Sequence, residues 1–314
     1  GIFTYSINIV FKDDLTLFSL IPRLDYANGF QEKMSVLLGH NNEHRMLFVN
    51  VATWWVYLIT GEINFKLTAV IGSLSLAILL MLFYKMFSVI RYKAVFFLPV
   101  IFFVLSLNTW RVVIQPINPL SNYYVICFVG MALWYLCKPG NMLFILALFM
   151  AFLATFNQAS GMLIFVPGQL YLLAQKKIKK GVIWFLFGAL CLFCYLNDIQ
   201  FGEASGFSKE ADMTPLNFLG FYFAFLGSSL SLGKTILAIP VGLMGFVYFL
   251  YLTWKQYYFK NPVIYYFIFF IIIAGSAVAY GRTEFGVSSA LSPRYQLNSV
   301  TLMVLLYLSA LEIF

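Results

Sequence analysis

Long apolar runs, separated by short polar breaks, dominate the hydrophobic pattern of this chain. A helix that crosses a membrane needs about 20 predominantly apolar residues, because the hydrocarbon core is about 30 Å thick. Several runs are shorter, and their helices are expected to extend into flanking loops or to pack against protein. The pattern predicts an all-α, polytopic transmembrane helical bundle with about nine spans. The runs lie at 67–84, 94–110, 122–137, 142–157, 161–175, 181–198, 235–254, 262–280 and 297–314.

Residues 1–66 interrupt this pattern with mixed polar and apolar sequence. The opening GIFTYSINIV resembles the tail of an apolar segment, which suggests a first membrane helix that is cut short. Trp54, Trp55 and Tyr57 are of the types that favour the membrane–water interface, so an interfacial helix is expected there. We therefore divide the chain into a long extracytoplasmic first loop at 1–66 and a transmembrane bundle at 67–314.

Composition supports a membrane protein and excludes a soluble one. Only 10% of the 314 residues are charged and 62% are hydrophobic, whereas a soluble domain carries about 25% charged residues. All four cysteines lie in apolar runs, which predicts packing rather than a disulfide framework. They are Cys127, Cys137, Cys191 and Cys194.

The charged residues indicate how the bundle is oriented. Four loops hold ten lysines and arginines and no acidic residue; they are 85–93, 138–141, 176–180 and 255–261. By the positive-inside rule these loops are cytoplasmic, so the longer, mixed loops face the periplasm or the exterior of an inner (plasma) membrane. Those outer loops hold every Asp and Glu except Glu312. The net charge of +8 therefore reflects topology and anionic membrane lipid, and no nucleic-acid partner is expected.

The apolar segment 216–232 is assigned differently from the other runs. Counting it as a span would place the basic loop 255–261 outside and Arg282 and Arg294 inside, against the charge pattern. We therefore expect an interfacial or re-entrant element at this position.

The stretch LLGHNNEHRML contains H-x-x-E-H at His40, Glu43 and His44, the motif order of inverzincin metalloproteases. That site needs a stable helix and a third zinc ligand, a glutamate farther along the chain. No Asp or Glu lies between positions 62 and 198, there is no third histidine, and the two asparagines in the motif are poor helix formers. A zinc protease is therefore disfavoured. A looser divalent-cation site, a structural Glu43–Arg45 pair, and substrate contact by Glu43, His44 and Arg45 remain open.

Asp13 and Asp14 follow directly after the apolar start of the chain. Two adjacent carboxylates at the outer mouth of a first helix could deprotonate an acceptor hydroxyl or hold a divalent cation. The alternative is that they only mark the end of a helix at the water interface. No cofactor is otherwise indicated.

Arg282 and Arg294 flank the loop GRTEFGVSSALSPRY between the last two apolar runs. Guanidinium groups bind phosphate and pyrophosphate through paired hydrogen bonds, so these arginines, with Tyr295 and Arg111, are candidate contacts to a phosphorylated substrate. The alternatives are snorkelling, a local Arg282–Glu284 ion pair, and a helix cap by Arg111. No Walker or dinucleotide-binding glycine pattern occurs in the chain.

This arrangement resembles the GT-C class of integral-membrane glycosyltransferases, which have many helices and a long first outer loop with acidic residues just after the first helix. Asp13 and Asp14 match that position, and NNEHR and GRTEFGVSSALSPRY are similar to stretches in bacterial membrane proteins of this type. The resemblance implies a polyprenyl-phosphate sugar donor and a cell-envelope glycan, lipid or protein acceptor. It implies Asp14 or Asp13 as catalytic base and Arg282 and Arg294 at the phosphate leaving group.

Other functions fit parts of the same pattern. An O-antigen-type polymerase or ligase also places arginine-rich outer loops over lipid-linked glycans, and it does not need the acidic pair. A transporter of lipid-linked glycans predicts ionisable residues at mid-membrane depth, and apart from Glu312 the apolar runs carry none. A purely structural membrane subunit is the remaining alternative.

Overall fold

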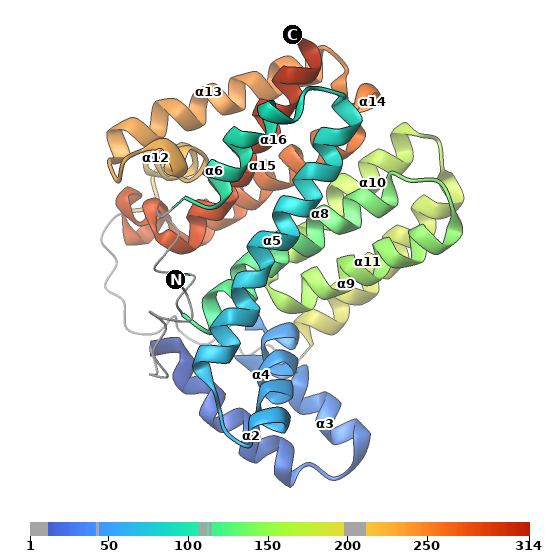
Figure 1. Ribbon diagram of the computed structural model, residues 1–314, viewed down its shortest axis with the longest axis vertical. Coiled ribbons are helices and arrows are strands. Elements are labelled where there is room, and N and C mark those ends of the chain that lie inside the picture. Colours follow the sequence, from blue (N-terminus) through green and yellow to red (C-terminus); the bar gives the residue numbers. More distant parts are fainter. Residues whose placement is uncertain (1–11, 42–43, 107–111, 113–114, 198–211) are drawn as a thin grey trace.

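The computed structural model describes residues 12–41, 44–106, 112, 115–197 and 212–314. Within these ranges the chain is almost entirely helical (Figure 1). The exception is a two-residue antiparallel ladder, in which β1 (His40–Asn41) pairs with β2 (His44–Arg45). The predicted all-α class is thus confirmed.

Six helical segments in the described ranges are long and apolar enough to cross a membrane, judged by length and composition. This finding supports the predicted multi-pass membrane protein. The segments are α5 (Phe65–Ile90), η4 with α8 (Pro119–Leu136), α11 (Ile178–Leu196), α13 (Thr235–Trp254), α15 with η7 (Pro262–Phe285) and α16 (Pro293–Ile313).

The predicted count of about nine spans is not confirmed, because three of the predicted spans form apolar helices of fewer than 18 residues, too short to be counted as membrane spans. These are η2 with α6 (Ala94–Val104), α9 (Asn141–Asn157) and η5 with α10 (Ala159–Ala174). The break between α9 and η5 is tight: a Cβ on Gly161 would lie 2.0 Å from the backbone oxygen of Ala154. Only glycine permits this approach, so η5 packs directly against the last turn of α9.

The N-terminal helices form a separate layer below the bundle, drawn in blue in Figure 1. Helix α4 contains Trp55, which is 64% exposed, as an interfacial helix requires. The elements of this layer are η1 (Lys12–Thr16), α2 (Leu17–Tyr26), α3 (Gly29–Leu37), the ladder β1–β2 and α4 (Leu47–Thr60).

Helix α8 forms the centre of the bundle. In the segment that contains it, 83% of residues are buried, against 28% in α11 and in α13. A Cβ on Gly130 would lie 2.4 Å from Leu82 of α5 and 2.8 Å from Phe267 of α15, so this glycine lets both neighbours pack closely. Small residues at helix contacts are typical of membrane bundles. The apolar residues exposed on α11 and α13 are those expected to face lipid.

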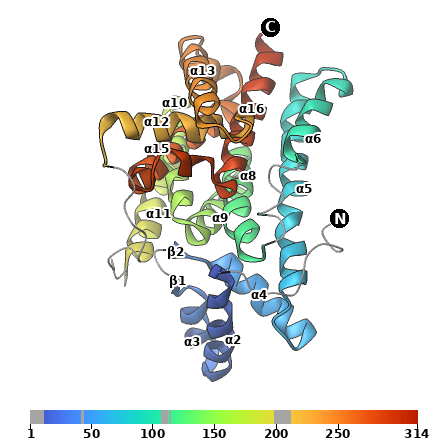
Figure 2. The same ribbon diagram turned by 90° about the vertical axis from the view of Figure 1, so that its left-hand side faces the viewer.

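The segment predicted to be interfacial or re-entrant corresponds to α12 (Pro215–Gly227) and η6 (Ser228–Leu230). Figure 2 shows α12 lying across the direction of α5. It packs against α13 through glycine, since a Cβ on Gly227 would lie 2.0 Å from Ala238 O. Whether α12 enters the membrane stays a prediction.

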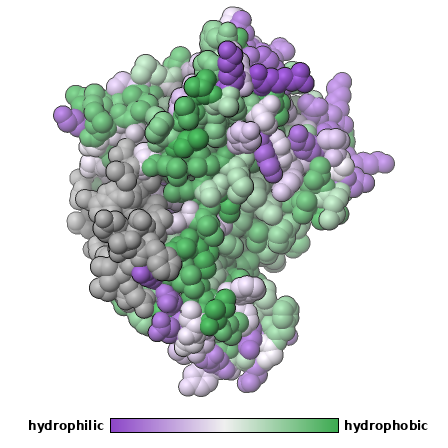
Figure 3. Space-filling model, in the orientation of Figure 1, coloured by the Kyte–Doolittle hydropathy of each residue, from purple (hydrophilic) through white to green (hydrophobic). Residues whose placement is uncertain are grey.

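Polar residues gather at two ends of the molecule, with apolar surface over much of the region between them (Figure 3). We call one of these the basic end: it carries the loops 85–93, 138–141, 176–180 and 255–261, along the upper and right-hand edge of Figure 1. We call the opposite ends of α8, α9, α15 and α16 the cavity end.

Candidate functional site

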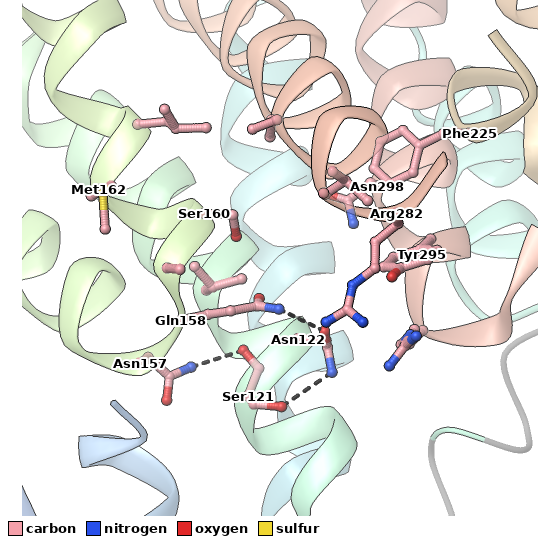
Figure 4. Close-up of a pocket in the computed structure, with 18 of the residues that line it drawn as sticks. Ser121, Asn122, Asn157, Gln158, Ser160, Met162, Phe225, Arg282, Tyr295 and Asn298 are labelled. Atoms are coloured by element: carbon pink, nitrogen blue, oxygen red, sulfur yellow. Dashed lines mark hydrogen bonds between the residues drawn. The ribbon is translucent and has the colours of Figure 1, made fainter. Parts of the chain in front are cut away.

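A cavity of about 430 Å³ lies at the cavity end of the bundle (Figure 4). Ligand sites in proteins typically occupy about 300–1,000 Å³ and combine apolar walls with a few polar groups. This cavity has that character, with Met162, Leu163, Phe270, Ala274 and Val278 among its apolar walls. Its polar lining comes from three places: the start of the η4–α8 segment, the α9–η5 turn, and the connection between α15 and α16.

The floor of the cavity is the turn that begins α8. The π-helical element η4 (Pro119–Tyr123) begins within the sequence QPINPLSN; it contains Ser121, and Asn118 directly precedes it. A Cβ on Gly72 would lie 2.5 Å from the Pro119 ring, so the turn is pressed against α5. Turns of π-helix are rare and occur often at functional sites.

Three carboxamide side chains form a connected row along this floor. Gln158 Nε2 donates to Asn122 Oδ1 (2.9 Å), and Asn122 Nδ2 donates to Ser121 Oγ (3.1 Å). Asn157 Nδ2 donates to the backbone oxygens of Leu120 (2.9 Å) and Ser121 (2.8 Å). These bonds fix which end of each carboxamide carries the nitrogen. The row is therefore rigid and has a defined polarity.

Two arginines converge on the facing wall because α15 ends and α16 begins there. Arg282 is the last residue of α15, half-buried, with its guanidinium 5.5 Å from the Phe285 ring centre. Arg294 is exposed near the start of α16, 5.0 Å from the ring of Tyr295. Tyr295 is buried and packs against Phe225 at 5.6 Å. The structure thus brings together the three predicted residues of the last loop.

The cavity has a positive electrostatic character. Both arginines line it, whereas the lining residues that the structure describes include no Asp or Glu. Figure 4 shows the Arg282 guanidinium directed toward Asn122. Guanidinium groups in a partly dry hollow bind phosphate strongly, since charge-assisted hydrogen bonds gain as water is excluded.

Asp14 lies behind the cavity wall rather than in the cavity. Its side chain is 2% exposed, and Oδ1 accepts the backbone N–H of Ile117 at 3.3 Å. Ile117 itself lines the cavity. Asp14 therefore supports the floor from the N-terminal layer. The backbone of Asp13 belongs to η1, and its side chain is outside the described part of the structure.

Arg45 has a different environment from the one predicted. It is buried, does not line the cavity, and donates to the backbone oxygens of Leu38 (2.7 Å), Asn197 (2.6 Å) and Tyr195 (3.2 Å). Tyr195 and Asn197 lie at the carboxyl end of α11, where orphan carbonyls favour a cation. Arg45 thus anchors the N-terminal layer to the bundle.

The two histidines of the H-x-x-E-H motif, His40 and His44, lie in the β1–β2 ladder and not in a helix. His40 Nε2 lies 3.3 Å from Asn197 O, beside the Arg45 anchor. No group of three metal-ligating side chains occurs among the described residues. Glu43 and Arg111 lie outside the described residues, as does the side chain of His44, so their roles and the divalent cation stay predictions.

The carboxamide row was missed by sequence reasoning. Asn122, Asn157 and Gln158 are uncharged, and they lie at the edges of QPINPLSN and NQAS, two short polar breaks between predicted apolar runs. The usable signal was the density of amide and hydroxyl groups in both breaks, since both open on the same side of the bundle.

Comparison with known proteins gives no guide here, because no protein-family model, curated protein or solved structure matches the chain. The fold and the site define a multi-pass helical membrane protein with a positively charged, carboxamide-floored cavity at one end. Its function has to be argued from that geometry.

Proposed function

We propose that the protein is a membrane glycosyltransferase. It moves a sugar from a polyprenyl-phosphate donor to a cell-envelope glycan, lipid or protein acceptor on the outer face of the inner membrane. The observation that carries this proposal is the cavity, which joins Arg282 and Arg294 to a floor of carboxamides inside an apolar bundle.

The arginine wall suits the leaving group of such a reaction. Breaking the sugar–phosphate bond leaves negative charge on the lipid phosphate, and fixed guanidinium donors stabilise that charge as it develops. The apolar wall around Phe270 and Ala274 offers a surface for the first prenyl units. A lipid-borne donor is also what an outer-face enzyme needs, because nucleotide sugars are cytoplasmic.

The acidic pair supplies the base in this proposal. Asp14 or Asp13 accepts the proton of the acceptor hydroxyl as the oxygen attacks the anomeric carbon. Asp14 is linked to the cavity through the Ile117 backbone, so the acceptor would enter from the side of the N-terminal layer. That layer then forms part of the acceptor site.

The proposal also includes an orientation in the membrane. About nine spans, with the basic end in the cytoplasm, would place the cavity at the periplasmic or extracellular side. Support comes from the separation of the two ends: α9 starts beside Lys138 and ends at the cavity, and α15 starts beside Lys260 and ends at Arg282.

One observation favours a second candidate, an O-antigen-type polymerase or ligase. Asp14 does not line the cavity, and this alternative transfers whole glycan blocks without the acidic pair. It uses the same arginine wall for the lipid phosphate.

Mass spectrometry of surface glycans distinguishes the candidates. We compare cells that carry the wild-type protein, no protein, Asp14→Asn, Arg282→Gln, or Lys255→Gln as a control at the basic end, with the protein level in membranes checked for each. Loss of one sugar in the deletion and in both cavity-end variants supports the transferase. Collapse of a polymer to a single repeat unit, with Asp14→Asn normal, supports the polymerase. An unchanged glycan profile in the deletion contradicts both.

A further inference from the structure

The polarity of the carboxamide row says more about the ligand than the arginines do. Gln158 uses its nitrogen on Asn122, so its oxygen is directed the other way, on the side of Ser160 in Figure 4. Asn157 uses its nitrogen on two backbone oxygens, and its Oδ1 is buried without a hydrogen-bond partner among the described residues. That oxygen is out of reach of a ligand, since Asn157 is fully buried. The fixed acceptor that this end of the row presents to the cavity is therefore the oxygen of Gln158.

The two sides of Asn122 have opposite electrostatic character. On one side lies Gln158, whose oxygen repels anions and accepts hydrogen bonds from hydroxyl groups; on the other lies the guanidinium of Arg282, which attracts anions (Figure 4). A ligand that satisfies both sides carries an anion at one end and hydroxyl donors at the other.

A cationic group at the hydroxyl end is disfavoured. Ammonium groups donate hydrogen bonds too, but Arg282 lies just beyond Asn122, and the described lining contains no carboxylate to balance a further positive charge. Moving an uncompensated cation into a partly buried hollow is costly. The group beside Gln158 is thus expected to be uncharged.

From this we infer that the cavity binds the phosphate ester of a neutral sugar in one orientation, with the phosphate at Arg282 and Arg294 and the sugar hydroxyls at Gln158 and Asn122. The inference rests on the proposed function for the lipid nature of the ligand, and it adds the sugar class and two residues that select it.

Binding measurements on the purified full-length protein in lipid nanodiscs test this assignment. The probes are a short-chain polyprenyl phosphate alone, the same lipid carrying a neutral hexose, and the same lipid carrying a hexosamine with a free ammonium group. We expect the wild-type protein to bind the hexose form about tenfold more tightly than the bare lipid and the ammonium form, since one or two satisfied acceptors account for about that ratio.

Gln158→Met keeps the length of the side chain and removes its acceptor. We expect it to lower the affinity for the hexose form about tenfold, to the level of the bare lipid. Gln175→Met, an exposed change at the far end of α10, is the matched control, and thermal unfolding verifies that both variants fold. Arg282→Gln should weaken binding of all three lipids.

Each outcome separates the two proposals. A preference for the hexose form that survives in folded Gln158→Met overturns the assignment of the row, and equal binding of the ammonium form overturns the neutral-sugar class. Selective binding without transfer to any acceptor leaves the inference standing and removes the transferase. Failure of the wild-type protein to bind any of the three lipids overturns both.

Discussion

Lysines dominate one end of the bundle, and arginines line the cavity at the other. At the basic end, cations lie over aromatic rings: Lys138 over the half-buried Trp134 at 4.5 Å and Lys255 over the exposed Trp254 at 4.7 Å. At the cavity end, Arg282 and Arg294 also lie beside rings, but they face a hollow with a fixed polar floor. The first arrangement spreads charge over a surface, and the second aims it at one place.

We infer from this difference that the number of charged groups matters at the basic end, whereas their position matters at the cavity end. The carboxylate of Glu312 at the basic end accepts from Tyr257 (2.6 Å) and Asn261 (2.9 Å). Burial, with that carboxylate beside it, raises the pKa of Tyr257, which therefore stays a neutral donor. In the proposed orientation the lysines lie toward the membrane surface, where any one of them can substitute for another. The cavity arginines have no such substitutes.

The largest effect is expected when the cavity end loses its attachment to the N-terminal layer. Arg45→Met removes the donor of three main-chain oxygens, among them those of Leu38 and Tyr195, and we expect a loss of about 3 kcal/mol in folding stability. Thermal unfolding in detergent measures the loss, with Arg23→Met, an exposed change in the same layer, as control. Equal melting of the two variants would contradict the anchoring role.

Removing the charge of one cavity arginine should be the next largest effect. We expect Arg282→Gln to lower the affinity for polyprenyl phosphate about 100-fold, because a charge-assisted contact to phosphate is lost. Lys255→Gln removes the same charge at the basic end and should change affinity less than twofold. Equilibrium binding in nanodiscs measures both, and similar effects of the two substitutions would remove the distinction between the ends.

Substitutions that keep the positive charge but change the shape of the charged group test whether the two ends differ in more than net charge. Arg282→Lys retains a cation but not the planar fork, so we expect about a tenfold loss of phosphate affinity. Lys138→Arg, the reverse exchange at the basic end, should have no measurable effect on binding. A lysine at position 282 that binds as well as arginine would mean that only net charge matters in the cavity.

The smallest effect is expected for a single neutralisation at the basic end. Lys138→Gln leaves nine of the ten basic residues in the four loops, so the orientation of the protein should be unchanged. Labelling of single cysteines introduced into the loop 138–141, from either side of the membrane, measures it. Inverted labelling after this one change would contradict the view that these lysines act as a sum.

The sequence was informative where one short segment determines the outcome. Apolar runs predicted helices, and one connecting loop already held Arg282, Arg294 and Tyr295 together. It was uninformative where distant segments meet. Arg45 was interpreted as a substrate contact because nothing in NNEHR indicates that oxygens some 150 residues away receive its guanidinium. The close packing of η5 against α9 depends on contact between Gly161 and Ala154, which hydropathy cannot reveal.

The Arg45 anchor also has a consequence for biosynthesis. Its partners at Tyr195 and Asn197 lie 150 and 152 residues farther along the chain. At about 5–20 residues per second, a ribosome needs roughly 8 to 30 seconds to supply them after Arg45 has emerged. During that interval the Arg45 guanidinium has to remain hydrated, because its acceptors at Tyr195 and Asn197 have not yet been synthesised. The layer that contains Arg45 is therefore anchored to the bundle only after the end of α11 has been synthesised.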